Sequence, residues 1–159
     1  MRRAFGFAKH KKVVSNETLF GADGIDVIRG GRGADNIDGM SGNDALFGGR
    51  GSDVLAGGYG ANFLTGGRGH DVFFFALFDD ITTISDFTSG KDRVRTAFIN
   101  NPEAGNIVFG AEALDGDDYL IYDSVTGRLL YDHDGVGGDE AVQFAVVNPG
   151  TSITASDFF

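Results

Sequence analysis

The sequence predicts an all-β protein, a parallel β-roll of nonapeptide repeats followed by a small antiparallel β cap. The first observation is a nine-residue period that runs from Gly21 to Phe74 and contains 16 of the 26 glycines. The second is that short runs rich in β-branched and aromatic residues replace this rhythm after Phe75. The third is that the C-terminal half has no helical period longer than a few residues.

Six consecutive blocks make up the repeat, and they read GADGIDVIR, GGRGADNID, GMSGNDALF, GGRGSDVLA, GGYGANFLT and GGRGHDVFF. The sixth position holds Asp26, Asp35, Asp44, Asp53, Asn62 and Asp71. The eighth position holds Ile28, Ile37, Leu46, Leu55, Leu64 and Phe73. A six-residue polar turn followed by a three-residue strand predicts one side of a flattened coil. Two blocks then make one winding, and successive windings stack about 4.8 Å apart as parallel strands.

The turns are expected to need glycine at positions one, two and four, where positive φ angles and inward-facing carbonyl oxygens leave no room for a Cβ. Alternate blocks fall on opposite edges of the coil. Asp26, Asp44 and Asn62 should stack on one edge, and Asp35, Asp53 and Asp71 on the other.

Stacked carboxylates about 5 Å apart repel by roughly 0.8 kcal/mol in water and by about 3 kcal/mol at an effective dielectric of 20. Ca²⁺ accepts six to eight oxygen ligands, which suits turns that each offer carbonyls and one carboxylate. The ion is therefore expected to supply folding free energy. The predicted metal-binding residues are Gly30, Gly31, Arg32, Gly33, Asp35, Gly48, Gly49, Gly51, Asp53, Gly66, Gly67, Gly69, Asp71, Asp26, Asp44 and Asn62.

These blocks resemble the repeats of the repeats-in-toxin (RTX) family, whose pattern is GGxGxDxUx with U a large apolar residue. The second, fourth and sixth blocks match it at every fixed position, whereas Ala22, Met40 and Asn62 depart from it on a single edge. The resemblance implies two good sites between Asp35, Asp53 and Asp71, weaker sites on the other edge, and about three to five Ca²⁺ ions. A calcium-free, glycine-rich linker is the alternative, but it leaves the apolar column at position eight unexplained.

Residues after 75 predict the cap. Its expected strands are Asp80 to Phe87, Ile107 to Phe109, Tyr119 to Tyr122, Arg128 to Tyr131 and Ala141 to Val147. Ser124 to Gly127 reads as a hairpin loop, and Phe73, Phe75 and Phe87 are expected at the junction with the last winding. An end cap is needed because a stacked repeat otherwise exposes an open edge and core.

The segments ITTISDFTSGKDRV, LLYDHDGVGGDEAVQFAVV and ITASDFF resemble the C-terminal part of serralysin-type exported proteins. This resemblance implies export through a type I (ABC transporter) machinery that reads an uncleaved signal, to which Asp157, Phe158 and Phe159 correspond. A final strand packed into the core is a compatible alternative for the two phenylalanines. The basic start lacks the apolar stretch of a cleaved signal peptide, so the expected location is extracellular, for a bacterial protein secreted without one.

The charge distribution favours cations as partners. The formal net charge is −10, and residues 13–159 carry eight basic against 23 acidic side chains. Such a surface repels nucleic acid, no apolar run is long enough to span a membrane, and the absence of cysteine excludes disulfides and thiolate metal sites. The expected division is a basic, disordered tail at 1–14, the roll at 15–75 and the cap at 76–159.

Two further patterns concern a separate metal site and catalysis. Asp132, Asp134 and Gly135 are similar to the start of an EF-hand loop, but Gln143 stands where the closing Glu is required, which favours a polar turn over a separate metal site. The sequence has no H-E-x-x-H run, G-x-S-x-G elbow or phosphate loop, and the prediction is that the chain is not an enzyme.

Arginine recurs at position three of the three consensus blocks, as Arg32, Arg50 and Arg68. One interpretation is that these exposed side chains soften the negative field of the neighbouring carboxylates. The other is a cationic ladder that binds an acidic polysaccharide in a calcium-dependent way, similar to the repeat modules of alginate-modifying enzymes.

Overall fold

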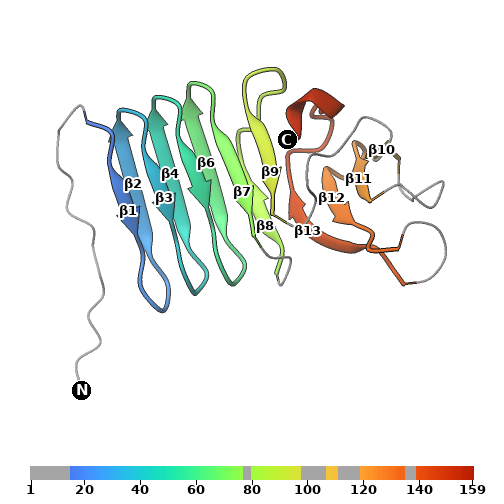
Figure 1. Ribbon diagram of the computed structural model, residues 1–159, viewed down its shortest axis with the longest axis horizontal. Coiled ribbons are helices and arrows are strands. Elements are labelled where there is room, and N and C mark those ends of the chain that lie inside the picture. The colour runs from blue at the N-terminus through green and yellow to red at the C-terminus, as the bar shows by residue number, and fades with distance from the viewer. Residues whose placement is uncertain (1–14, 77–79, 98–106, 111–118, 135–138) are drawn as a thin grey trace.

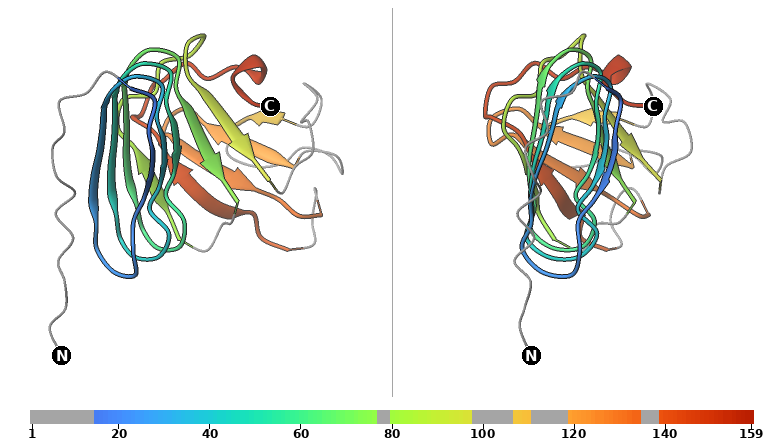
Figure 2. Two further views of the ribbon diagram at one scale, coloured as in Figure 1. Left: turned by 60° about the vertical axis from the view of Figure 1, so that its left-hand side comes forward. Right: turned by 90° about the vertical axis from the view of Figure 1, so that its left-hand side faces the viewer.

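In the computed structural model, the repeats wind into a flattened coil whose two parallel sheets face each other (Figure 1). Viewed along the stack, successive windings superpose (Figure 2). The structure describes residues 15–76, 80–97, 107–110, 119–134 and 139–159, so the tail predicted for residues 1–14 lies outside the described residues. The all-β class and the parallel β-roll are as the sequence predicts.

Five strands form the first sheet, and each pairs in parallel with the next. The register joins Leu19 to Ile37, Ile37 to Leu55, and Leu55 to Phe73, so the interval along the chain is two blocks. The strands are β1 (Thr18–Phe20), β3 (Asn36–Asp38), β5 (Val54–Ala56), β7 (Val72–Phe75) and β9 (Arg93–Thr96).

The second sheet contains the alternate strands of the roll. Ile28 pairs with Leu46, Leu46 with Leu64, and Leu64 with Ile84, again in parallel. The strands are β2 (Val27–Arg32), β4 (Ala45–Arg50), β6 (Phe63–Arg68) and β8 (Thr82–Ile84).

The core of the roll is the column of residues at position eight of each block. All six are at most 3% exposed, as expected for side chains that point between the two sheets. This confirms the predicted column, to which β7 adds a second buried apolar side chain, Phe75.

Parallel pairing continues beyond residue 75, where the glycine rhythm ends, because β8 and β9 add a further winding in the same two sheets. The interval from Phe73 to Val94, which includes β8, is 21 residues instead of the 18 between Leu55 and Phe73, yet Val94 pairs with Phe73 and is fully buried. The column of apolar side chains, and not the glycine pattern, carries the winding through this region.

The cap consists of β10 (Ile107–Phe109), β11 (Leu120–Asp123), β12 (Arg128–Tyr131) and β13 (Val142–Val146). The last three pair antiparallel, and residues 124–127 form the predicted hairpin loop, with Gly127 at a φ of 78°. β10 pairs in parallel with β11, so the cap has one parallel edge strand that was not expected.

The cap extends one sheet of the roll. β13 pairs in parallel with β8, which gives a single eight-stranded sheet in the order β10-β11-β12-β13-β8-β6-β4-β2 (Figure 1). Aromatic side chains fill the junction, as predicted: the ring centroids of Phe73 and Phe87 are 6.0 Å apart, and those of Phe75 and Phe144 are 5.1 Å apart.

The last residues pack against the roll. After a short 3-10 turn, η2 (Ala155–Asp157), Phe158 forms a parallel bridge with Val94 and is 5% exposed. Phe158 therefore packs into the core, as one of the two compatible interpretations expects, whereas Phe159 is 36% exposed. In the described part of the chain, no helix has the length and apolar character that crossing a membrane would require.

Candidate metal sites

The turns of the roll owe their shape to glycines at position four of every block and at position two of four of the six blocks. In the turn of residues 48–53, Gly49 has a φ of 114° and Gly51 a φ of 139°, angles that favour glycine strongly. The same positions are left-handed in the turns of residues 30–35 and 66–71. Met40 occupies position two in one block and adopts a φ of 71° without being glycine.

At position one, only one of the two expected reasons for glycine applies, namely the lack of room for a Cβ and not a positive φ. Gly48 is not in the left-handed region, but a Cβ built on it would collide with Oδ2 of Asp53 and lie 2.7 Å from the carbonyl oxygen of Gly66. The residue at position one thus lies directly against the carboxylate of its own turn. It must be glycine because there is no space for a Cβ.

The aspartates line two edges, as the sequence predicts, and a ladder of hydrogen bonds joins them. The backbone N–H of Asp35 donates to Oδ1 of Asp53 at 2.8 Å, and that of Asp53 donates to Oδ1 of Asp71 at 2.9 Å. On the opposite edge, Asp26 N–H donates to Oδ1 of Asp44, and Asp44 N–H donates to Oδ1 of Asn62, both at 2.8 Å. Each ladder bond occupies only Oδ1 of the accepting side chain, which leaves Oδ2 of each aspartate free of the ladder.

The second oxygen has no hydrogen-bond partner in four of these carboxylates, although it is buried. These atoms are Oδ2 of Asp35, Asp44, Asp53 and Asp71, on side chains that are at most 2% exposed. Buried polar atoms in folded proteins are nearly always paired with protein, water or an ion. Four unpaired oxygens in equivalent positions of a repeat indicate a shared missing partner.

The charge of these groups is costly without such a partner. Burial raises the pKa of Asp44 and of Asp53, and it raises the pKa of Asp71 to about 6. The ladder hydrogen bonds act in the opposite direction, and repulsion from neighbouring carboxylates adds to the rise. A cation beside Oδ2 would reverse both effects.

The donor set suits a hard cation. Within the described residues, no three His, Asp or Glu side chains gather closely enough to hold a metal by themselves. Each turn instead brings one carboxylate oxygen together with backbone carbonyls, and oxygen-only ligation is the preference of Ca²⁺. Asp35, Asp53, Asp71 and Asp44, with the carbonyls of their glycine turns, are the residues that fit such an ion.

The ladder is longer than the repeat suggests, because two residues outside the six blocks extend it. Glu17 N–H donates to Oδ1 of Asp35 at 2.8 Å, and Asp71 N–H donates to Oδ1 of Asp92 at 3.1 Å. The signal was present: Asp92 and Val94 repeat the Asp-x-apolar pattern of Asp71 and Phe73, although at a longer interval.

Protein donors replace a cation at two ends of the ladders. Oδ2 of Asp26 accepts the N–H of Ala22 at 2.7 Å, and Oδ2 of Asp92 accepts the N–H of Thr88 at 2.8 Å. Asp86, which the sequence did not single out, accepts the N–H groups of Gly66 and Gly67 at 2.9 and 2.8 Å. These carboxylates close the ladder and differ from the four with an unpaired oxygen.

The three arginines of the consensus blocks are in register. Arg32 pairs with Arg50, and Arg50 with Arg68, at the ends of β2, β4 and β6. All three side chains are exposed. The ion pair found among the described residues involves a different arginine, Arg128, whose guanidinium lies 3.6 Å from Asp123.

The segment similar to an EF-hand forms a polar turn where it is described. Asp134 N–H donates to Oδ1 of Asp132 at 3.2 Å, and Asp139 N–H donates to Oδ2 of Asp134 at 3.1 Å. Gly135 lies outside the described residues. These bonds within the turn favour the interpretation as a polar turn.

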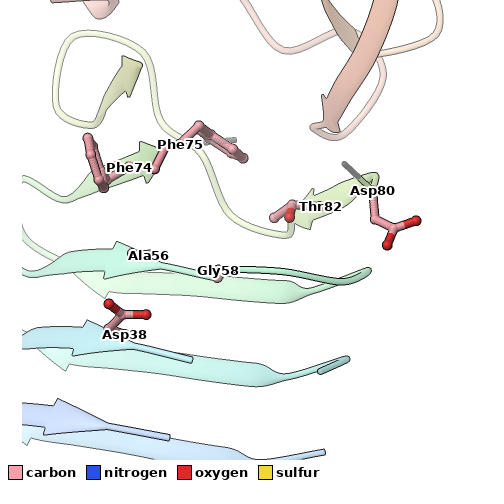
Figure 3. A pocket seen from close by; sticks show the side chains of 9 residues that line it. Asp38, Ala56, Gly58, Phe74, Phe75, Asp80 and Thr82 are labelled. Atoms are coloured by element: carbon pink, nitrogen blue, oxygen red, sulfur yellow. The ribbon is translucent and has the colours of Figure 1, made fainter. Parts of the chain in front are cut away.

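A small pocket of about 90 Å³ lies beside the turn of residues 57–62. Asp38 and Asp80 line it together with Phe74, Phe75 and glycines. Figure 3 shows the two carboxylates on different sides of the pocket, one on β3 and the other before β8. They do not converge, so this pocket lacks the clustered polar groups of a binding site.

Comparison with known proteins bears on the repeat. The family model of the RTX calcium-binding nonapeptide repeat, which spans four copies, matches residues 15–46 and again residues 47–81. The curated proteins contain no match to the chain. The solution structure of the AlgE6R3 subunit from the Azotobacter vinelandii mannuronan C5-epimerase is similar at 23% identity over 97% of this chain and 84% of that chain, with a TM-score of 0.37. At that TM-score the similarity carries no argument about function.

Proposed function

Residues 15–81 are RTX calcium-binding nonapeptide repeats, and from this premise we propose that the chain is a secreted β-roll protein that folds when Ca²⁺ binds between its turns. The calcium-dependent part is residues 15–75, and residues 76–159 close the roll and carry the secretion signal. We propose no catalytic role, because the repeat family is one of cation binding.

One observation carries the proposal: Oδ2 of Asp35, Asp44, Asp53 and Asp71 is buried without a partner. Leaving a buried polar group unsatisfied costs about 1–3 kcal/mol, and more for a charged group. Four such groups therefore cost an amount comparable to the whole stability of a typical domain, about 5–15 kcal/mol. Without cations, the roll should not be stable at neutral pH.

Bound Ca²⁺ supplies positive charge and accepts oxygen ligands, which removes this cost. Asp35, Asp53 and Asp71 would hold ions on one edge with the carbonyls of their turns, and Asp44 on the other. Four unpaired oxygens support the expected number of about three to five ions, with the stronger sites on the edge of Asp35, Asp53 and Asp71.

Calcium dependence also supports the proposal of export. Extracellular calcium modules bind with dissociation constants of about 10⁻⁴ to 10⁻³ M, so such a chain stays unfolded where Ca²⁺ is scarce and folds where it is abundant. An unfolded chain suits passage through a type I transporter. Asp157 and Phe158 are buried in the folded protein, so a transporter would have to read them before folding.

Far-UV circular dichroism during a calcium titration, followed by excess EDTA, tests the function. We expect a strand spectrum to appear between about 10⁻⁴ and 10⁻³ M Ca²⁺ and to disappear on chelation. The double variant Asp53→Ala, Asp71→Ala should need more Ca²⁺, whereas Asp139→Ala, in an exposed turn, should not. A fully ordered protein in EDTA that does not change on addition of Ca²⁺ would falsify the proposal.

The register of Arg32, Arg50 and Arg68 supports a second candidate, calcium-dependent binding of an acidic polysaccharide. Exposed guanidinium groups about 4.8 Å apart suit a chain of carboxylates. The net charge of −10 opposes it, so calcium-driven folding is the better-supported function. Binding to alginate or polygalacturonate in millimolar Ca²⁺ should be lost when all three arginines become serine; binding that persists would remove this candidate.

A further inference from the structure

The turn of residues 57–62 has an amide where its neighbours have a carboxylate. Asn62 is 2% exposed, and its Oδ1 accepts the N–H of Asp44 at 2.8 Å. Oδ1 of Asp71 accepts the N–H of Asp53 in the same way, at 2.9 Å. Oδ1 of Asn62 therefore takes the same part in the ladder as Oδ1 of the aspartates.

The second side-chain atom also takes the same place. A Cβ built on Gly57 would lie 2.6 Å from Nδ2 of Asn62, and a Cβ built on Gly66 would lie 2.5 Å from Oδ2 of Asp71. Both glycines hold position one of their blocks. Nδ2 of Asn62 thus occupies the position of the unpaired carboxylate oxygen in the other turns.

At this position Asn62 has a hydrogen-bond donor, whereas the aspartates have an acceptor. Nδ2 donates to the carbonyl oxygen of Gly60 at 2.8 Å and to that of Gly58 at 3.4 Å. The ladder bond fixes this orientation of the amide, because Oδ1 must face the donor N–H of Asp44. A carboxylate has no proton to offer these carbonyls, so an aspartate here would bring oxygen atoms together and would need a cation between them.

We infer that the side-chain amide of Asn62 substitutes for the Ca²⁺ that a carboxylate at this position would bind, so that Nδ2 closes the turn of residues 57–62 with hydrogen bonds and no ion lies beside it. This inference rests on the proposed calcium function of the neighbouring turns. It separates Asn62 from the residues that hold metal, although the repeat pattern groups it with them. The turn lies beside the cap side of the roll, where the carbonyl of Asn62 accepts the N–H of Thr83 just outside the repeats. One turn next to the cap is thereby fixed before any ion arrives.

Calcium stoichiometry of the full chain, measured by native mass spectrometry and by calorimetric titration, tests the inference through two opposite substitutions. Asn62→Asp should bind one more Ca²⁺ than the parent protein, and its folding midpoint should move to higher Ca²⁺. Asp53→Asn should bind one fewer. Asn43→Asp is the matched control for charge: Asn43 is exposed on the same edge, and its Oδ1 accepts the N–H of Ala61 at 2.9 Å, so an added carboxylate there should leave the stoichiometry unchanged.

Asn62→Ala separates this role from that of a weak calcium ligand. It removes the donor Nδ2 together with the acceptor Oδ1 that binds the N–H of Asp44, so the melting temperature in saturating Ca²⁺ should fall while the number of bound ions stays the same. A loss of one ion in Asn62→Ala, or an unchanged number in a folded Asn62→Asp, overturns the inference. If the parent protein binds no Ca²⁺, the proposed function fails first, whereas normal binding by the parent with either of those results overturns the role of Asn62 alone.

Discussion

The buried carboxylates of the roll and those of the cap are in opposite electrostatic situations. Burial raises the pKa of Asp53 and, to about 6, that of Asp71 in the roll. In the cap, the hydroxyl of Thr126 and nearby backbone N–H groups bind Asp123 and hold its pKa below the usual value. The difference lies in the number of donors that each carboxylate finds.

Asp157 shows this most clearly. Burial acts to raise its pKa, but it accepts hydrogen bonds from Ser89 Oγ at 2.7 Å, from Gly90 N–H at 2.9 Å and from Thr154 N–H at 2.8 Å, and the net result is a lowered pKa. The cap supplies its acids with partners from the chain itself. The roll leaves one oxygen of each internal aspartate without a partner from the chain, and under the proposed function this difference would make the roll the calcium-sensitive region.

Calcium removal should separate the two regions most strongly. Addition of EDTA should lower the hydrogen-exchange protection of backbone amides in β4, β5 and β6 by about three orders of magnitude, because roughly 4 kcal/mol or more of unsatisfied charge appears there. Amides of β11–β13 should lose less protection. Hydrogen exchange followed by mass spectrometry measures both regions at once, and equal losses in the two would contradict a local calcium dependence.

Phe144→Ala should produce the complementary result. Its ring is fully buried against Phe75, so the substitution should lower the free energy of unfolding in saturating Ca²⁺ by about 3–5 kcal/mol. The number of bound ions should not change, because Phe144 has an apolar side chain and belongs to β13 of the cap, outside the glycine turns. Thermal melts and stoichiometry should be compared with Asp53→Ala, which should reduce both. A loss of ions in Phe144→Ala would show that cap and sites are not independent.

The pH dependence in EDTA should have opposite signs in the two regions. A raised folded pKa contributes stability that is present below the unfolded value of 3.8 and is lost as the pH rises through the folded value, about 6 for Asp71. Acidification from pH 7 to pH 5 should therefore increase strand content in the roll without calcium. Below pH 3.8 the cap should weaken, because Asp123 and Asp157 lose the charge that their donors stabilise.

Circular dichroism in EDTA at pH 7, 5 and 3 measures this effect. With calcium present the roll should respond in the reverse direction, since protons compete with the ion for the carboxylates as the pH falls. A steady loss of structure from pH 7 to pH 5 in EDTA would contradict the assignment of unpartnered carboxylates to the roll.

Met40→Gly should give the smallest effect, and it is the one substitution here that should raise the melting temperature. Met40 has a φ of 71° in a position where four of the other five blocks carry glycine, and a non-glycine residue in that region costs about 1 kcal/mol. The melting temperature in saturating Ca²⁺ should rise by about 2–4 °C. Met40→Leu, which keeps a Cβ, is the control and should give no increase; a gain in both variants would point to the side chain and not to the backbone.

The nine-residue period predicted the roll, the two edges and the buried column because each follows directly from spacing. It failed where the interval changes. Asp92 and Val94 continue the ladder and the column after a longer loop, and Glu17 begins the ladder before the first glycine block. An insertion shifts all later residues out of a fixed period, so the period no longer identifies them. The strands can still pair, because the inserted residues are accommodated between them.

The sequence also could not separate carboxylates that lack a partner from those that have one. Asp26 and Asp53 occupy the same position of the repeat, yet the N–H of Ala22 binds the Oδ2 of Asp26 and nothing binds that of Asp53. The parallel pairing of β10 with β11 was missed for a similar reason, since a short apolar run carries no information about strand direction.

The shared eight-stranded sheet gives the molecule a direction of growth. β13 presents a formed edge to β8, β8 to β6, β6 to β4, and β4 to β2. Each winding can therefore add to an existing template, which avoids the loop-closure cost of nucleating parallel strands afresh. The windings would then form one after another from the C-terminal side toward residue 15. Each ion that binds would stabilise the winding formed last before the next one is added.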